Sequence, residues 1–127
     1  MDFASIRIIT ADVDRLAAFY ELVTGLEAVR PAPVFAEFRT GAATLAIGST
    51  ATVAMLGAGA PRPGGESSII IEFLVDDVDA QFARLRPRLA DADVVLEPTT
   101  MPWGNRSTLI RDPDGNLVNL FTRPAAA

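Results

Sequence analysis

The chain of 127 residues contains no histidine and no cysteine, and none of its 11 basic residues is lysine. Without histidine it lacks the commonest general base, the commonest metal ligand and every Ser–His or Cys–His nucleophilic pair. Without cysteine it can form no disulfide, and without lysine it can form no Schiff base. A metal site would have to be built from carboxylates and carbonyls, which suit hard cations rather than zinc.

The remaining composition is typical of one soluble globular domain, with 50% hydrophobic and 21% charged residues. No apolar run approaches the roughly 20 residues that span a bilayer. The first nine residues carry an acid at Asp2 and only one base, which argues against a secretory signal. We therefore expect a cytoplasmic protein. The net charge of −5 argues against nucleic-acid partners and is compatible with a cationic small-molecule ligand.

A faint internal repeat divides the chain. The segment Ile9–Asp14 matches Leu74–Asp79 at a displacement of 65 residues, and in both an apolar run meets Asp-Val-Asp. A second, shorter match, between Thr44-Leu45 and Thr108-Leu109, has a displacement of 64 residues. The repeat predicts two half-domains of one design.

The first half is predicted to be β-α-β-β-β. A strand is expected over residues 5–11, followed by a helix that Asp12 caps and Gly25 ends. Its buried stripe is expected to comprise Val13, Leu16, Ala17, Tyr20 and Val23. Three short strands are expected over residues 34–40, 43–48 and 52–57. The Gly- and Pro-rich segment that follows, 58–66, is predicted to be a linker.

The second half repeats the order. A strand over residues 68–75 is followed by a helix that Asp77 caps and Pro87 kinks or ends. Its expected stripe is Val78, Phe82, Leu85 and Leu89, and further strands are expected over residues 94–97, 107–111 and 117–122. Asp112 and Asp114 are interpreted as part of the turn Asp-Pro-Asp-Gly-Asn. We thus predict a single α+β domain, with modules 1–57 and 67–123, whose two sheets each leave one face open and come together as a cup.

This organisation, together with Arg111–Phe121 and Pro102-Trp103-Gly104, resembles the vicinal oxygen chelate superfamily. That group includes glyoxalase I, extradiol dioxygenases and bleomycin-resistance proteins. The resemblance implies paired βαβββ modules in a glyoxalase-like cupped half-barrel, a homodimer, and a site inside the cup.

The resemblance also places the metal ligands of this superfamily, which lie on the first and last strands of each module. They correspond to Ser5, Ile70, Asn119 and either Ala54 or Met55. Ile and Ala offer no donor, and neutral Ser and Asn are weak ligands. We therefore expect a member of the superfamily with no metal and no cofactor.

Alternation from Ser5 and Ile70 places Arg7 and Glu72 on the open faces, again 65 residues apart. They are expected either to pair with each other or to contact a ligand, and Glu72 is the candidate acid or base. Glu37 is a further acid whose side of the sheet the sequence leaves open. Trp103 either fills the domain edge or a dimer contact, or stacks on a planar ligand.

These observations favour a metal-independent protein that binds a drug or metabolite, similar to bleomycin-resistance proteins. Its expected ligand-binding residues are Ser5, Arg7, Glu72, Trp103, Asn119 and Phe121. The alternative is a metal-free isomerase or lyase that uses Glu72 as acid/base and Arg7 as an anion stabiliser. A third possibility is a cup that has lost its ligand and serves only in dimerisation.

Overall fold

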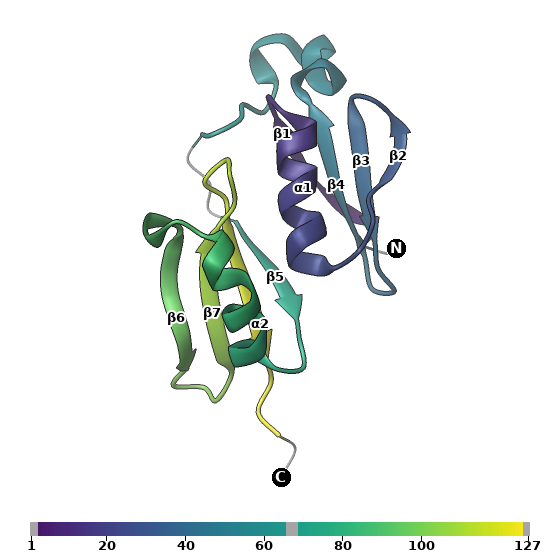
Figure 1. Cartoon of the computed structure of the whole chain (residues 1–127). Helices are drawn as coiled ribbons and strands as arrows, with labels where there is room; N and C mark the ends of the chain where they lie inside the picture. Colours follow the sequence, from purple (N-terminus) through teal and green to yellow (C-terminus); the bar gives the residue numbers. More distant parts are fainter. Residues whose placement is uncertain (1–2, 66–68, 126–127) are drawn as a thin grey trace. The chain divides into compact units, whose positions relative to one another are not determined.

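The computed structural model describes residues 3–65 and 69–125, and the chain divides into two compact units at Gly65/Glu66. Each unit contains a four-stranded sheet with an α-helix packed on one face (Figure 1). The α+β class and the two βαβββ modules predicted from the sequence are therefore confirmed. No helix in these two ranges is long and apolar enough to cross a bilayer.

Unit 1 begins with β1 (Ser5–Thr10) and α1 (Val13–Thr24). The strands β2 (Val29–Ala32), β3 (Phe35–Arg39) and β4 (Thr44–Ser49) follow, and then a 3-10 segment, η1 (Thr50–Gly59). The sheet order is β1-β4-β3-β2, with β1 parallel to β4 and the other pairs antiparallel.

The helix α1 forms as its sequence predicts. Asp12 caps it by accepting a hydrogen bond from the backbone N–H of Arg15, and Gly25 ends it in the left-handed conformation at φ 70°. All five residues of the predicted stripe are buried: Val13, Leu16, Ala17, Tyr20 and Val23. The Tyr20 ring packs on Phe38 of β3 at a centroid distance of 6.3 Å, which anchors the helix to the sheet.

Unit 2 repeats the design with β5 (Ile70–Leu74), α2 (Val78–Leu85), β6 (Val94–Thr100), β7 (Arg106–Arg111) and β8 (Leu117–Thr122). Two short 3-10 turns, η2 (Arg86–Arg88) and η3 (Asp91–Asp93), lead from α2 to β6. The sheet order is β5-β8-β7-β6, with β5 parallel to β8. Asp77 caps α2 as predicted, and the helix ends at Leu85, before Pro87. Val78 and Leu85 of the expected stripe are buried, whereas Leu89 lies beyond the helix.

The turn between β7 and β8 is held by Asp112, which is only 2% exposed. Its Oδ1 accepts from the backbone N–H groups of Asp114 and Asn116, each at 2.9 Å. Its Oδ2 accepts from Asn116 Nδ2 at 2.8 Å. Gly115 takes the positive φ that the turn requires, 87°. The interpretation of this segment as a turn is confirmed.

The prediction of a strand over residues 52–57 is wrong. These residues lie in η1, which Ser49 caps by accepting from the backbone N–H of Ala51. Gly57 interrupts η1 with a φ of 58°. Because η1 extends to Gly59, the predicted linker 58–66 begins inside η1. The segment is rich in small residues and has no period-two alternation, so nothing favours an extended strand. Glu66, Ser67 and Ser68, at the predicted linker end and strand start, lie outside the described residues.

The strand that completes the first module is β2, which the sequence analysis missed. It contains Pro31, which lacks a backbone donor, and its register against β3 is irregular between Val29 and Ala32. Consequently β4, not residues 52–57, is the last strand of its module. The sequence match between Thr44 and Thr108 therefore does not relate equivalent positions. Thr44 lies on β4, whose counterpart in unit 2 is β8, whereas Thr108 lies on β7.

Candidate functional site

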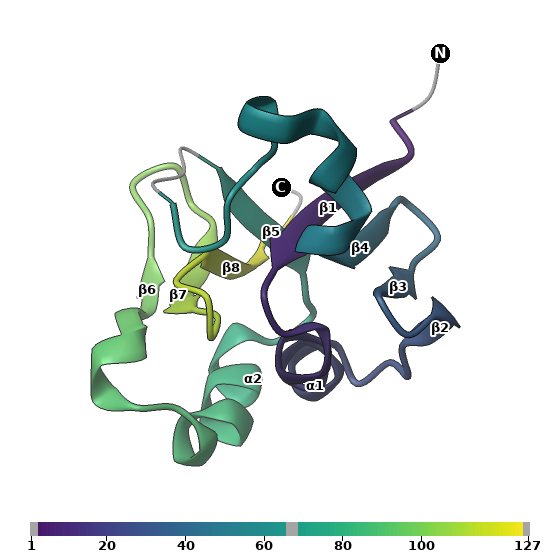
Figure 2. The same ribbon diagram turned by 90° about the horizontal axis from the view of Figure 1, so that it is seen from above.

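Each sheet has one face free of its helix, and each of these open faces is considered by itself as a candidate site. In unit 1, α1 covers the face that carries Ala36, Phe38, Leu45 and Ile47, all buried. The alternate residues of the same strands point the other way. Figure 2 shows α1 and η1 on opposite sides of β1 and β4, so η1 borders the open face.

The open face of unit 1 consists of three rows set by strand register. The middle row is Arg7–Ala46–Glu37, running from β1 across β4 to β3. The flanking rows are Ser5–Thr44–Arg39 and Ile9–Gly48–Phe35. The side of the sheet on which Glu37 lies, open from sequence, is thus the side of Arg7. The small residues Ala46 and Gly48 on β4 lie between the longer side chains of β1 and β3.

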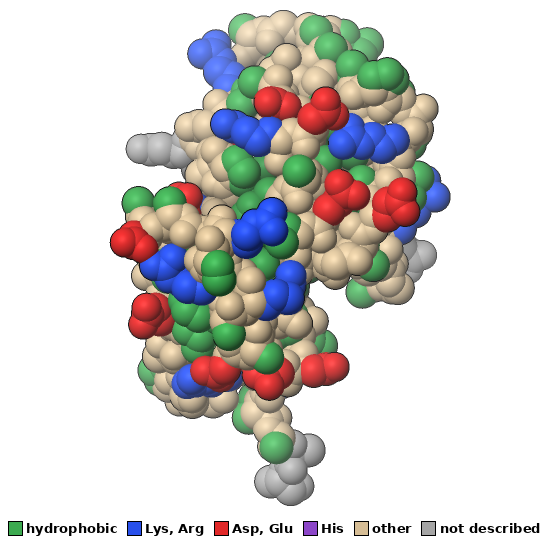
Figure 3. Space-filling view, in the orientation of Figure 1, with side chains coloured by type: hydrophobic (Ala, Val, Ile, Leu, Met, Phe, Trp, Pro, Cys, Tyr) green, Lys and Arg blue, Asp and Glu red, His purple; other side chains and the backbone are tan. Residues whose placement is uncertain are grey.

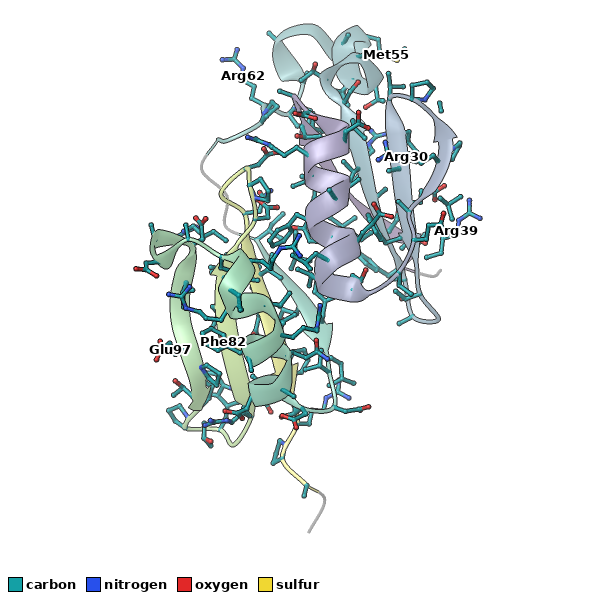
Figure 4. All side chains as sticks on the ribbon, viewed as in Figure 1. Arg30, Arg39, Met55, Arg62, Phe82 and Glu97 are labelled. Atoms are coloured by element: carbon teal, nitrogen blue, oxygen red, sulfur yellow. The ribbon has the colours of Figure 1, made fainter. Side chains whose placement is uncertain are left out.

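Two contacts confirm how these side chains lie. A Cβ atom built on Gly48 would meet Arg7 Cδ at 3.3 Å and Thr52 Oγ1 of η1 at 2.7 Å. The Arg7 stem therefore runs over Gly48, beside Thr52. On the other edge, Arg39 Nη2 donates to Glu37 Oε1 at 3.0 Å. Figure 4 shows Arg39 projecting from the outer part of unit 1.

The open face of unit 2 has the same construction but different chemistry. Its middle row is Glu72–Asn119–Leu109, from β5 across β8 to β7. The flanking rows are Ile70–Leu117–Arg111 and Leu74–Phe121–Ser107. Polar groups in the middle row are therefore bordered by apolar side chains on β5 and β8.

Glu72 and Asn119, two residues singled out from sequence, are hydrogen-bonded to each other. Asn119 Nδ2 donates to Glu72 Oε2 at 2.8 Å. Asn119 is 9% exposed, and its Oδ1 is buried with no hydrogen-bond partner in the described parts of the chain. Glu72 is exposed. The pair therefore combines a buried amide oxygen without a donor and an exposed carboxylate.

The opposite face of unit 2 carries an ion pair that joins α2 to the sheet. Arg106 Nε and Nη2 donate to the two carboxylate oxygens of Asp79 at 2.9 and 2.7 Å. The hydrogen bond from Arg106 lowers the pKa of Asp79 below its ordinary value, and the same bond raises the pKa of Arg106. This pair is structural and lies on the helix-covered side.

The metal positions implied by the resemblance can be placed by register. Arg7 pairs with Ala46 as Glu72 pairs with Asn119, so Ala46 on β4 is the counterpart of Asn119. The earlier assignment to Ala54 or Met55 is wrong, because both lie in η1. Figure 4 shows Met55 at the outer part of η1, and it is 92% exposed.

The corrected set of four positions is Ser5, Ala46, Ile70 and Asn119. It contains one hydroxyl, one amide and two side chains without a donor, which does not fit a divalent metal. Throughout residues 3–65 and 69–125, no three His, Cys, Asp or Glu residues are grouped to hold a metal ion.

Trp103 lies in the hairpin between β6 and β7, where Met101 and Asn105 pair their backbones. Its side chain is 65% exposed, so it does not fill the core of unit 2. Phe121 is half-buried on the open face, and Ser5 is exposed on the first strand of unit 1. The sequence analysis did not single out Ala46 on β4 and Arg39 on β3, because their places on the open face follow from the pairing of β4 with β1 and β3.

The surface carries charges of both signs. In the view of Figure 3, Arg and Asp/Glu side chains are interspersed over the molecule.

Comparison with known proteins shows the family of this fold. A family model described as "Glyoxalase/Bleomycin resistance protein/Dioxygenase superfamily" matches residues 2–120. No curated protein matches the chain.

Several solved structures share the fold along almost the whole chain. A glyoxalase/bleomycin resistance protein/dioxygenase family enzyme from Burkholderia phytofirmans PsJN has a TM-score of 0.82 at 18% identity, covering 96% of this chain and 98% of its own. A lactoylglutathione lyase from Agrobacterium tumefaciens has a TM-score of 0.72 at 27% identity, covering 94% and 92%. A glyoxalase-related enzyme from Fulvimarina pelagi has a TM-score of 0.79 at 19% identity, covering 99% and 93%.

Proposed function

The chain belongs to the glyoxalase/bleomycin resistance protein/dioxygenase superfamily, and on this basis we propose that it binds a small organic molecule without a metal ion. The ligand, a drug or metabolite, binds to an open sheet face. The observation that carries the proposal is the donor set at the four metal positions. Ser5, Ala46, Ile70 and Asn119 are a poor set for a metal, while the same faces keep charged and aromatic groups for an organic ligand.

The proposed binding residues have complementary roles. Arg7 and Glu72 supply charges of opposite sign, and Ser5 and Asn119 supply hydrogen-bonding groups. Phe121 on the open face of unit 2 and the exposed Trp103 supply apolar and stacking surface. This mixture suits a molecule with both polar and apolar parts.

We further propose that the protein is a cytoplasmic homodimer. The sheet orders leave β1 and β2 at the edges of one sheet and β5 and β6 at the edges of the other. Edge strands have backbone groups available for pairing with other chains. Size-exclusion chromatography with light scattering should give twice the chain mass of 13.5 kDa at micromolar concentration. A strict monomer would contradict the dimer.

The binding proposal is tested with protein that has been treated with EDTA and exchanged into metal-free buffer. A panel of cationic, anionic and neutral aromatic or aliphatic compounds is screened by thermal shift. The proposal predicts that at least one class raises the melting temperature in EDTA and is recovered unchanged. If stabilisation appears only after a divalent metal is added back, metal-independent binding is wrong.

A second candidate function is a metal-free isomerase or lyase with Glu72 as acid/base and Arg7 as anion stabiliser. It is favoured by the exposure of Glu72, which engages Asn119 through Oε2 and leaves Oε1 without a hydrogen bond in the described ranges. An oxygen placed in this way can exchange a proton with a ligand. Turnover of a bound compound that is lost in Glu72→Gln would establish this function, whereas unchanged recovery from both proteins would exclude it.

A further inference from the structure

We propose that the Glu72–Asn119 pair binds the N–H groups of an organic cation, an ammonium or guanidinium carried on an apolar body. This inference rests on the proposed function and names the chemical class of its ligand. It starts from the unsatisfied oxygen of Asn119, which the sequence alone does not reveal.

The orientation of the Asn119 amide is fixed by its neighbour. The carboxylate of Glu72 can only accept, so the amide must present Nδ2 to it, at 2.8 Å. Oδ1 therefore points away from Glu72. A buried amide oxygen without a donor is destabilising, and most such groups in native proteins find a partner. The missing partner of Asn119 must be a donor.

The two residues that pair with Asn119 across the sheet have no side-chain hydrogen-bond donor for its Oδ1. On one side lies Glu72, and on the other lies Leu109 of β7. The two oxygens of the pair without a hydrogen bond in the described residues, the buried Asn119 Oδ1 and Glu72 Oε1, are both acceptors, and Glu72 carries negative charge. Both acceptors call for an N–H donor, and the exposed carboxylate of Glu72 favours a donor that carries positive charge. A carboxylate or phosphate ligand would meet two acceptors and be repelled.

The apolar side chains of the open face define the body of the ligand. Leu117 and Phe121 flank Asn119 along β8, and Ile70 and Leu74 flank Glu72 along β5. Ile70 and Leu74 are 46% and 57% exposed, which is unusual for large apolar side chains on the face of a sheet. An apolar chain or ring attached to the cation would cover them. The net charge of −5 adds a weak long-range attraction for a cation.

Matched probes test this inference. Hexylammonium and hexylguanidinium carry the predicted head group, while hexanoate and hexanol share the apolar chain but carry an anion or a neutral hydroxyl. Binding to the full-length protein is measured by NMR titration or calorimetry. The two cations are expected to bind roughly ten- to hundredfold more tightly than hexanoate, because charge-assisted hydrogen bonds contribute that much to affinity. Their affinity should fall as salt is added.

Variants separate a specific site from general attraction. Glu72→Gln keeps the shape and removes the charge, and Asn119→Leu removes the amide oxygen. Each should weaken binding of the cations by about tenfold or more. Glu97→Gln is the matched control, since Glu97 is exposed and projects outward from β6 in Figure 4, and it removes the same charge from the same unit. It should leave affinity unchanged.

Three outcomes decide the matter. A loss of affinity for the two cations in Glu72→Gln and Asn119→Leu, but not in Glu97→Gln, supports the inference. An equal loss of cation affinity in Glu97→Gln overturns the inference, because the protein would then attract cations through its overall negative charge. Tighter binding of hexanoate or hexanol overturns the cation specificity while leaving the proposed metal-independent binding intact. If none of the four probes binds and the wider panel also gives no stabilisation in EDTA, the proposed function itself fails.

Discussion

Asn119 on β8 and Glu72 on β5 are directly paired across a parallel sheet, and their side chains share a hydrogen bond of 2.8 Å. The pair stands where the superfamily resemblance places a metal ligand at Asn119. In this chain the same position holds an amide that is paired with a carboxylate and has a spare acceptor. The proposed function depends on this difference: the position forms hydrogen bonds to an organic ligand where the resemblance implies a metal ligand.

The unsatisfied oxygen of Asn119 makes a prediction about stability. Asn119→Leu should leave the free energy of unfolding unchanged or raise it by up to about 1 kcal/mol, because a buried acceptor without a partner is removed. The matched control is Asn116→Leu, since Asn116 Nδ2 donates to buried Asp112. That variant should lose about 1–3 kcal/mol. Urea unfolding measures both, and a larger loss in Asn119→Leu than in the control contradicts the assignment.

Gly48 is predicted to be required by its neighbour Thr52. A Cβ at this position meets Thr52 Oγ1 at 2.7 Å, so Gly48→Ala should destabilise unit 1 by about 1–3 kcal/mol. In a Thr52→Ala background the penalty should shrink, because the clashing atom is gone. Gly41→Ala, where nothing lies within 4 Å of the added atom, is the control. Equal penalties for Gly48→Ala in both backgrounds, measured by urea unfolding, would show that Thr52 is not responsible.

Substitution of Asp112, in the turn between β7 and β8, is predicted to lower the stability of unit 2. Asp112→Asn keeps the size of a side chain that is 2% exposed but weakens three hydrogen bonds to Asp114 and Asn116. The expected loss is about 1–3 kcal/mol of unfolding free energy. Asp76→Asn, at an exposed position, should change it by no more than about 0.5 kcal/mol. Similar thermal denaturation of the two variants would argue against a structural role for Asp112.

The Asp79–Arg106 ion pair gives a prediction about pH. Because Arg106 lowers the pKa of Asp79 in the folded chain, the pair stabilises the fold above the unfolded pKa of about 4. The contribution is lost as the pH falls through the lower, folded pKa. The difference in melting temperature between wild type and Arg106→Gln should therefore be constant from about pH 5 to 8 and shrink below about pH 4. It should also be small and decrease with salt, since the pair is solvent-exposed. A difference that persists undiminished at about pH 2 would falsify the assignment.

Much of this fold follows from the sequence because several local signals agree. In α1 the cap at Asp12, the five-residue stripe and the stop at Gly25 all indicate the same helix, and all are observed. The segment Val29–Ala32 gave no such agreement. Its proline argues against a strand, and only pairing with β3 makes it one. The Ala- and Gly-rich residues of η1 likewise have no periodic pattern, and the start of η1 is held by hydrogen bonds of Ala51 and Thr52 to Ser49.

The candidate site shows the same limit. Alternation placed Glu72 on the open face, because it is a local property of each strand, and the superfamily resemblance placed Asn119 there. Their hydrogen bond was not predictable, since it requires the register of β5 against β8. Ala46 was missed for the same reason: its equivalence to Asn119 appears only once β4 is seen to pair with β1.

The central claim is that this member of the superfamily needs no metal, and elemental analysis tests it most directly. The purified protein is equilibrated in turn with zinc, manganese, iron and nickel, freed of unbound ions, and measured by inductively coupled plasma mass spectrometry. We predict substoichiometric content for every metal, and no change when Asn119 is replaced by Leu. Stoichiometric metal that is lost in Asn119→Leu would contradict the claim.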